Sequence, residues 1–383
     1  ELTRLYLDHQ ASTPLDPRVR EAMLPWLDGA RAGNPHAAHR AGREAAVAVE
    51  QATDAVATLL GVRASEIVFT SGATEANHLA LHGLHHGMEA VAASAIEHPS
   101  VLACLDRLAE EGVPCRVLAV DAAGRVHPAE LGAVRTLVSV IAASNEIGTR
   151  QDLWAIVRAV HAGGGIVHSD ATQIVGRAPF DAGALGLDAA TISGHKLYGP
   201  MGVGALFVRA GLPLTPMLKG GGQQGGRRAG TVPVALAVGL GAACRIVQAE
   251  RTADAERLDT LARRFWGGLH ALWPAARLNG APFDLPGCLS VTLPGIDAAD
   301  LLLDVPDLAV STGAACASNT QRPSHVLTAI GLDAAAAQAS LRIGLGRFTT
   351  AADVDEAVTL LGAALRARAP QAVRESLPAG GAP

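Results

Sequence analysis

The stretch Thr191 to Pro200, TISGHKLYGP, places Lys196 in a small turn flanked by glycines. Apolar residues stand on both sides, at 189–192 and at 203–206, a pattern typical of buried strands. Most lysines are solvated surface charges. A lysine held between buried strands has a lowered pKa, and its neutral amine can then condense with a carbonyl. Lys196 is therefore a candidate Schiff-base lysine, the kind that anchors pyridoxal phosphate (PLP).

Strands and helices alternate along the chain up to Leu206. Apolar runs typical of strands occur at 67–70, 91–94, 117–120, 137–143 and 165–168, with helical patterns between them. This alternation predicts an α/β fold, a mostly parallel sheet flanked by helices on both faces. Such sheets bind ligands beyond the ends of their strands. Because Asn145, Asp170 and Lys196 each follow a strand, we expect them on one edge of the sheet, in one ligand site.

The turn from Ser71 to Glu75, between the first of these strands and its helix, is a candidate anion site. Backbone N–H groups at the start of the helix and the Thr74 hydroxyl can face a phosphate. The alternative is an ordinary cap, in which Ser71 or Thr74 serves the helix itself. The turn lacks the GK[ST] and GxGxxG patterns, which disfavours a nucleotide site. His98 also stands where a strand gives way to a helix, and by itself fits a capping or surface histidine.

Length and composition predict two units. The 383 residues, 49% hydrophobic and 17% charged, suit a compact protein. We expect a large domain at 16–252 and a smaller α+β domain at 253–383, completed by residues 1–15. The formal net charge is −5 and there is no basic block, which disfavours direct binding of nucleic acid or of an anionic membrane. The apolar run at 229–244 is short for a membrane span and contains Pro233, so we expect a buried helix.

The five cysteines include one that differs from the rest. None forms a CxxC pair or has the spacing of metal ligands, and with no signal sequence at the N-terminus this pattern favours a cytoplasmic protein. Four cysteines stand among apolar residues and fit an inert core: Cys104, Cys115, Cys244 and Cys288. Cys316 instead lies in a run of small and polar residues, which would leave its thiol exposed and mobile.

Two arginine-containing segments remain open at this stage. The glycine-rich segment 220–231 predicts a flexible surface loop with a solvated Arg227 and Arg228, or else a loop that presents Thr231 and an arginine to an anion. Arg342 lies in an apolar strand predicted at 341–348, and an arginine in such a strand usually has a carboxylate partner.

Read together, these motifs resemble the cysteine desulfurases, PLP-dependent enzymes of the class V aminotransferase-like family. The matching stretches run from residue 5 to about residue 360 in the family's order: Tyr6-Leu7-Asp8, 69–75, Glu97-His98, 145–148, 170–173, 193–196 and 342–349. The segment around Cys316, continuing to Leu327, is similar to the group with an extended mobile cysteine loop. The resemblance implies a PLP-dependent transferase-like fold with a smaller C-terminal α+β domain.

The resemblance also implies a role for each site residue. Lys196 would hold PLP as a Schiff base and then carry protons, Asp170 would pair with the pyridinium nitrogen, His98 would stack on the ring, and Gln173 would bind the phenolic oxygen. The phosphate would be held by Ala73, Thr74, Ser193, His195 and, from the neighbouring subunit of a homodimer, Thr231. Arg342 and Asn145 would bind the substrate carboxylate.

The implied substrate is L-cysteine. The Cys316 thiolate would attack its sulfur, form a persulfide and release L-alanine, and the sulfur would pass to an acceptor protein. Cys316 would also be a transient iron–sulfur ligand shared with a partner; no other metal site is expected. Gly225 and residues 319–322 depart from the family's pattern, and the acceptor stays open among cluster assembly, tRNA thiolation, DNA phosphorothioation and cofactor synthesis. The alternatives are a selenocysteine lyase or aminotransferase of the same fold, and a scaffold that has lost the chemistry.

Overall fold

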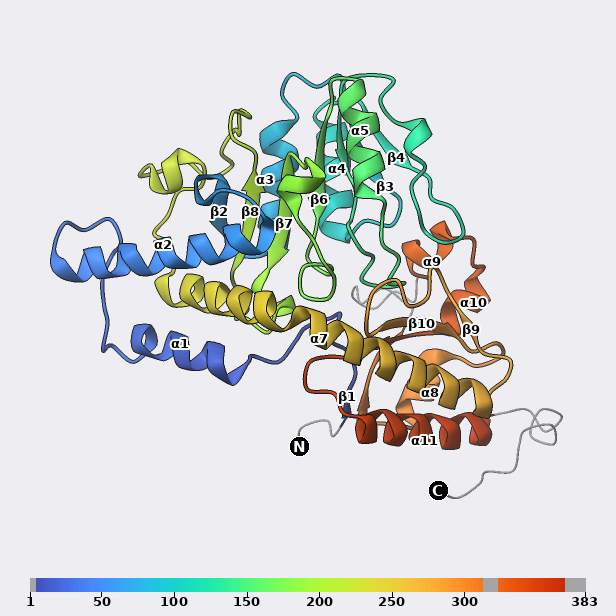
Figure 1. Ribbon diagram of the computed structural model, residues 1–383. Helices are drawn as coiled ribbons and strands as arrows, with labels where there is room; N and C mark the ends of the chain where they lie inside the picture. Colours follow the sequence, from blue (N-terminus) through green and yellow to red (C-terminus); the bar gives the residue numbers. More distant parts are fainter. Residues whose placement is uncertain (1–4, 313–322, 369–383) are drawn as a thin grey trace.

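The computed structural model describes residues 5–312 and 323–368. Within these residues a seven-stranded sheet forms the larger part of the fold (Figure 1), in the order β2-β8-β7-β6-β5-β3-β4. The strands are β2 (Ile67–Thr70), β3 (Ala90–Ser94), β4 (Cys115–Leu118), β5 (Thr136–Ser139), β6 (Ile166–Asp170), β7 (Ala189–Ser193) and β8 (Gly204–Val208). Strands β3 to β7 pair in parallel, whereas β8 pairs antiparallel with both β2 and β7. The predicted mostly parallel sheet is confirmed.

Helices cover both faces of this sheet. One face carries α3 (Ala73–Leu84) and α4 (Pro99–Glu110), and the other carries α2 (Arg40–Leu60), α5 (Leu153–Ala162) and the first half of α7 (Val234–Leu272). Successive strand residues alternate between the two cores: Val91 and Ala93 pack with α3 and α4, whereas Ala92 packs in the core on the other face. Both faces of the central strands are buried, which explains why these strands are mainly apolar rather than alternating with polar residues.

A second, smaller set of strands lies beside the main sheet. An antiparallel sheet has the order β12-β13-β10-β9, and β1 pairs with β11 in parallel. These strands are β1 (Leu5–Tyr6), β9 (Arg277–Leu278), β10 (Cys288–Thr292), β11 (Leu308–Ala309), β12 (Ser311–Thr312) and β13 (Ser340–Gly344). The accompanying helices are α8 (Ala298–Leu303), α9 (His325–Ala329), α10 (Ala334–Gln338) and α11 (Ala351–Arg368). Leu5 and Leu7 are buried in the core of this second unit.

The helix α7 joins the two units. The sequence predicts a buried helix at 229–244, but the structure has one helix of 39 residues, Val234–Leu272. Leu240 packs in the core of the main sheet, and Phe265 packs in the core of the second unit. Residues 245–254, between the two packed halves, contain neither glycine nor proline and remain helical. The proposed division of the chain at 252 and 253 falls inside α7.

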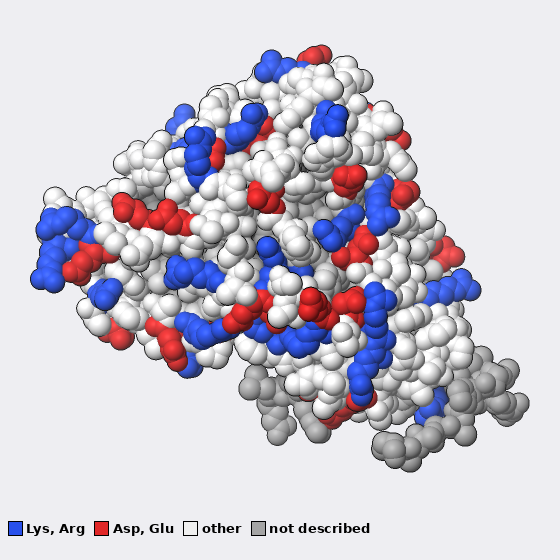
Figure 2. Space-filling model, in the orientation of Figure 1, with Lys and Arg blue, Asp and Glu red and all other residues white. Residues whose placement is uncertain are grey.

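Two shorter helices and a set of ion pairs complete the described chain. Helix α1 (Pro17–Leu27) packs on α7, and α6 (Ala182–Leu185) precedes β7. Figure 2 shows acidic and basic side chains next to one another on the face that it displays. Two of the ion pairs join Arg18 to Glu250 at 2.5 Å and Arg347 to Asp254 at 3.1 Å. Among the described helices, none is both long and apolar enough to cross a membrane.

Candidate active site

A cavity of about 710 Å³ lies where the ends of the main strands meet the second unit. Both units contribute to its wall, because Asp170 and Lys196 come from the main sheet and Ser290 and Arg342 come from the smaller one. Ten residues assigned to the site from the sequence line it: Ala73, Thr74, His98, Asn145, Asp170, Gln173, Ser193, His195, Lys196 and Arg342. Ala73 and Arg342 both line the cavity, so folding brings together residues that are 269 positions apart in the sequence.

Lys196 ends the short 3₁₀ turn Gly194–Lys196 that follows β7. The turn is tight, because a Cβ on Gly194 would lie 2.7 Å from the carbonyl oxygen of Pro200. The Lys196 Nζ donates hydrogen bonds to the carbonyl oxygens of Gln10 and, at 2.8 Å, Ala11. Burial, assisted by the charge of Arg342, lowers the pKa of Lys196 to about 8. A neutral amine is therefore accessible near neutral pH, as a Schiff-base lysine requires.

The buried carboxylate of Asp170 is held by a chain of hydrogen bonds. Asn77 on α3 donates from Nδ2 to Asp170 Oδ2 at 2.9 Å, and the Thr172 backbone N–H donates to Oδ1 at 3.0 Å. Asn77 also donates to the hydroxyl of Ser100 at 3.0 Å, and that hydroxyl lies 2.8 Å from His98 Nδ1. The network fixes the direction of the carboxylate toward the cavity.

Asn77 and Ser100 were not among the residues predicted from the sequence. Asn77 is fully buried and shares a helix face with Leu81 and Leu84, at spacings of four and seven residues. A polar residue on the apolar face of a helix is the signal that could have found it, because a buried amide needs a partner.

The start of α3 is free to bind an anion. No side chain caps this helix, whose N-cap Gly72 has a φ of 154°, so neither Ser71 nor Thr74 acts as the ordinary cap. The nearby Glu75 does not oppose an anion strongly, because its carboxylate pairs with Arg228 at 2.7 Å and accepts the Ser71 N–H at 2.7 Å. Exposed N–H groups at the first turn of a helix attract phosphate.

Two of the three histidines that line the cavity are neutral at neutral pH. Burial, then the charge of Lys196, lowers the pKa of His195 to about 4, and its Nδ1 lies 3.2 Å from the hydroxyl of Ser12. Burial also lowers the pKa of His98, whose side chain accepts the backbone N–H of Ser100 at 3.1 Å as the N-cap of α4. His98 therefore has both the capping position and a place in the cavity wall.

Arg342 on β13 has the carboxylate partner that its apolar strand predicts. One terminal nitrogen donates to Asp8 at 2.8 Å and to the Ser311 hydroxyl at 2.9 Å, and the other donates to the carbonyl oxygen of Asn145 at 3.3 Å. The Nε of Arg342 is buried and has no partner within the described residues. The guanidinium thus keeps a donor for a further anion.

Three predicted features lie elsewhere. Cys316 is outside the described residues, as are residues 319–322. Thr231 is exposed and is not part of the cavity wall. Arg227 and Arg228 are half-buried rather than solvated: Arg227 donates to the carbonyl oxygens of Ser65 and Ile67, at 2.9 and 3.1 Å, and Arg228 binds Glu75.

The cavity residues fit PLP. They offer an amine of lowered pKa, a buried carboxylate and an uncapped helix start. Buried polar atoms without partners in the described chain, Gln10 Oε1 and Thr172 Oγ1, belong to residues of the same wall. Fold and site together define a PLP-dependent enzyme.

Comparison with known proteins identifies the family. Residues 5–357 match the model of the aminotransferase class-V family, and the chain belongs to that family. A cysteine desulfurase IscS of Rickettsia akari is 42% identical over 373 residues, covering 93% of this chain and 90% of the relative. A human cysteine desulfurase is 41% identical over 369 residues, covering 93% of this chain and 80% of the relative.

Solved structures agree with these relatives. A NifS-like protein superposes with a TM-score of 0.88 at 35% identity, covering 94% of this chain and 99% of the other. SspA in complex with cysteine has a TM-score of 0.77 at 33% identity, covering 90% and 100% of the two chains. The resemblance to PLP-dependent cysteine desulfurases that the sequence motifs predict is confirmed.

Proposed function

We propose that this chain removes sulfur from L-cysteine, releases L-alanine and carries the sulfur as a persulfide on Cys316. The observation that carries the proposal is the cavity that both Lys196, from the main sheet, and Arg342, from the smaller one, line. An amino-acid substrate needs both groups, Lys196 near its amine and Arg342 to bind its carboxylate. The relatives of this chain are named cysteine desulfurases, and their name supplies the substrate.

The cofactor would be held by the residues already described. Asp170 would face the pyridine nitrogen, His98 the ring and Gln173 the phenolic oxygen, and the start of α3 with Ser193 and His195 would hold the phosphate. Bound PLP supplies an electron sink conjugated with the substrate Cα. The fully buried Asn77 keeps Asp170 oriented for this contact.

The protein's own residues would then bind the substrate and move its protons. Arg342 binds the carboxylate, with Asn145 beside it. The Lys196 Nζ, whose pKa of about 8 makes the neutral form accessible, takes the proton from Cα and later returns one to the carbon product. The Cys316 thiolate attacks the substrate sulfur: a sulfur–sulfur bond forms, the carbon–sulfur bond breaks, and its electron pair stays with the carbon product, which gains a proton and leaves as alanine.

The same proposal includes the partners. The exposed Thr231 would contribute to the phosphate site of a second copy in a homodimer. The persulfide would pass to an acceptor protein in the cytoplasm, and Cys316 would also act as a transient iron–sulfur ligand with such a partner.

The test compares Cys316→Ser with wild type and with Cys115→Ser as a matched control. With L-cysteine, wild type and control should release alanine and sulfide, whereas Cys316→Ser should keep the PLP absorbance and lose persulfide formation. Full desulfurase turnover by Cys316→Ser would refute the role of this thiol and favour a selenocysteine lyase or an aminotransferase. Absence of a visible violet PLP band, the band that Lys196→Ala should abolish, would favour a scaffold without chemistry.

A further inference from the structure

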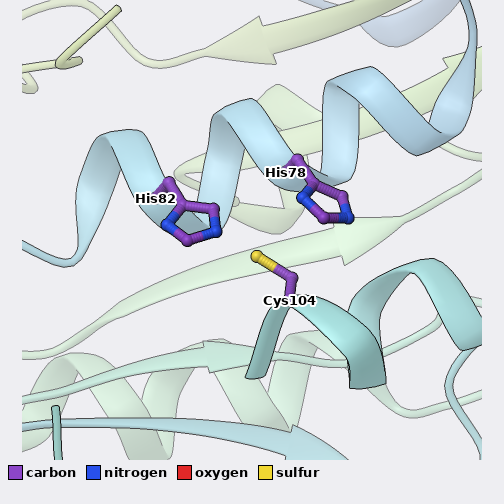
Figure 3. A group of neighbouring side chains, drawn as sticks. All are labelled: His78, His82 and Cys104. Carbon is purple, nitrogen blue, oxygen red and sulfur yellow. The ribbon is translucent and has the colours of Figure 1, made fainter. Parts of the chain in front are cut away.

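Two histidines of α3 and one cysteine of α4 face one another outside the active-site cavity. His78 and His82 are four residues apart, so they project from the same side of the helix. Figure 3 shows both imidazole rings turned toward the sulfur of Cys104 on the neighbouring α4. One ligand atom from each residue lies within 4.8 Å of the other two.

We propose that His78, His82 and Cys104 bind a divalent first-row metal ion that prefers nitrogen and sulfur ligands, with Zn²⁺ as the representative. Zinc takes histidine nitrogens and cysteine sulfurs in tetrahedral sites, and a set of three protein ligands leaves the fourth position for water. Zinc bond lengths place the ligand atoms of such a site about 3.3–3.6 Å apart. The ligand atoms, within 4.8 Å of one another, would have to move closer to bind the ion.

The burial of the three residues suits metal binding. His78 and His82 are half-buried and Cys104 is fully buried, so one side of the site remains accessible for the ion. Within the described chain no hydrogen bond engages either ring; the two rings stack with their centroids 5.8 Å apart, and the His82 ring also meets the His85 ring edge-on at 6.5 Å. A neutral histidine with an unengaged nitrogen can donate its lone pair to a metal.

The protonation states of the three side chains determine what metal binding must change. Burial lowers the pKa of both His78 and His82, so the rings are neutral at neutral pH. Burial raises the pKa of Cys104 to about 12, so the free protein holds a thiol there. Binding therefore replaces the thiol proton with the metal and releases that proton to solvent. Glu111 is the nearby anion, and its carboxylate pairs with Arg107 at 2.7 Å.

The ion would fasten α3 to α4. Both helices begin at the active-site cavity, with Ala73 in the first turn of α3 and His98 as the N-cap of α4. His78 is about 7–8 Å along the helix axis from Ala73, and it follows Asn77, which holds Asp170. The proposed ion is thus a structural support behind the cavity, independent of the desulfurase proposal.

The test uses the full-length holoenzyme without an affinity tag and with Cys316→Ser, which removes the thiol at that position. After removal of metals with a chelator, Zn²⁺ binding is measured by competition with a chromophoric chelator. We expect one ion per chain, and a loss of affinity of roughly a hundredfold or more in His82→Asn and in Cys104→Ala. The double variant His85→Asn/His86→Asn, at and just beyond the C-terminal end of α3, is the matched control and should bind as tightly as the parent.

Two further measurements separate this site from adventitious binding. Co²⁺ should give visible d–d bands at wavelengths longer than those of the cofactor, with the intensity of a tetrahedral site, and Cys104→Ala should lose them. Zn²⁺ should raise the melting temperature of the parent by several degrees and leave that of His82→Asn unchanged, because the ion binds only the folded chain. Binding that persists in His82→Asn and Cys104→Ala, binding lost in the His85/His86 control, or no stoichiometric binding would each overturn the proposal.

Discussion

In the apoenzyme, the amine of Lys196 should lose its proton near pH 8, because burial lowers its pKa from 10.5 to about 8. At pH 7 about one molecule in ten would then hold a neutral amine, against about one in three thousand at the ordinary pKa. The gain in the reactive form is therefore about 300-fold. It follows from the position of the turn between β7 and β8, before any cofactor binds.

The same pKa implies a stability cost. A folded-state value below the unfolded value means that the charged form is disfavoured by folding, with a penalty of ~3 kcal/mol. The penalty is fully present below pH 8 and is relieved as the pH rises from about 8 to about 10.5. Lys196→Met should therefore raise the free energy of unfolding of the apoenzyme at pH 7 by up to ~3 kcal/mol, and the advantage should vanish above pH 10.5.

The assay benefits from the composition of the chain, which contains two lysines, Lys196 and Lys219. Apoenzyme labelled with ¹⁵N-lysine should give two side-chain NMR signals, and Lys219→Arg assigns them. Arg342→Met should raise the pKa of Lys196 and Asp8→Asn should lower it, because the first removes a nearby positive charge and the second a negative one. A Lys196 signal that titrates above about pH 10 would refute the reasoning.

Three further perturbations address the rest of the fold and site. Arg342→Ala should raise KM for L-cysteine about 10–100-fold, the value of one or more charge-assisted hydrogen bonds, while the PLP absorbance is kept; an unchanged KM would exclude Arg342 from carboxylate binding. Asn77→Leu should lower the free energy of unfolding by ~1–3 kcal/mol in a urea titration, because the buried Asp170 carboxylate loses a donor; wild-type stability would mean that water replaces the amide. Asp16, whose pKa the Arg18 hydrogen bond lowers to about 2, should stabilise the fold by ~1–2 kcal/mol above pH 4 and lose this effect as the pH falls toward 2. Asp16→Asn should reduce the loss of folding free energy between pH 4 and pH 2, and an unchanged pH dependence in this range would contradict the assignment.

The edge of the main sheet could be predicted because its signals are local. Asn145, Asp170 and Lys196 each follow an apolar strand, and parallel strands place their carboxyl ends together. The fold class came from the same alternation. The partner of Arg342 could not be predicted from the local sequence pattern. Asp8 is 334 residues away, and only the folded chain brings the two side chains together.

The features that the sequence did not predict depend on tertiary contacts. Asn77 lies in an ordinary helical pattern, and its role appears only when Asp170 lies beside it. Arg227 is half-buried because it binds backbone carbonyl oxygens near β2. Every residue type has a backbone carbonyl, so the sequence does not indicate such a partner. In α7 the change from apolar to polar residues marks the passage between two cores, which composition alone does not distinguish from a loop.

The continuous helix α7 also limits how the two units can move. Its 39 residues span about 58 Å, and Figure 1 shows it extending from beside α2 to beside α11. Because each half is anchored in a different core, a hinge closing the cavity would have to bend this helix at its middle or peel one half from its core. The cavity walls are therefore expected to keep a fixed separation through the catalytic cycle. Loss of either core should unwind part of the same helix, so the two units should unfold in one cooperative transition.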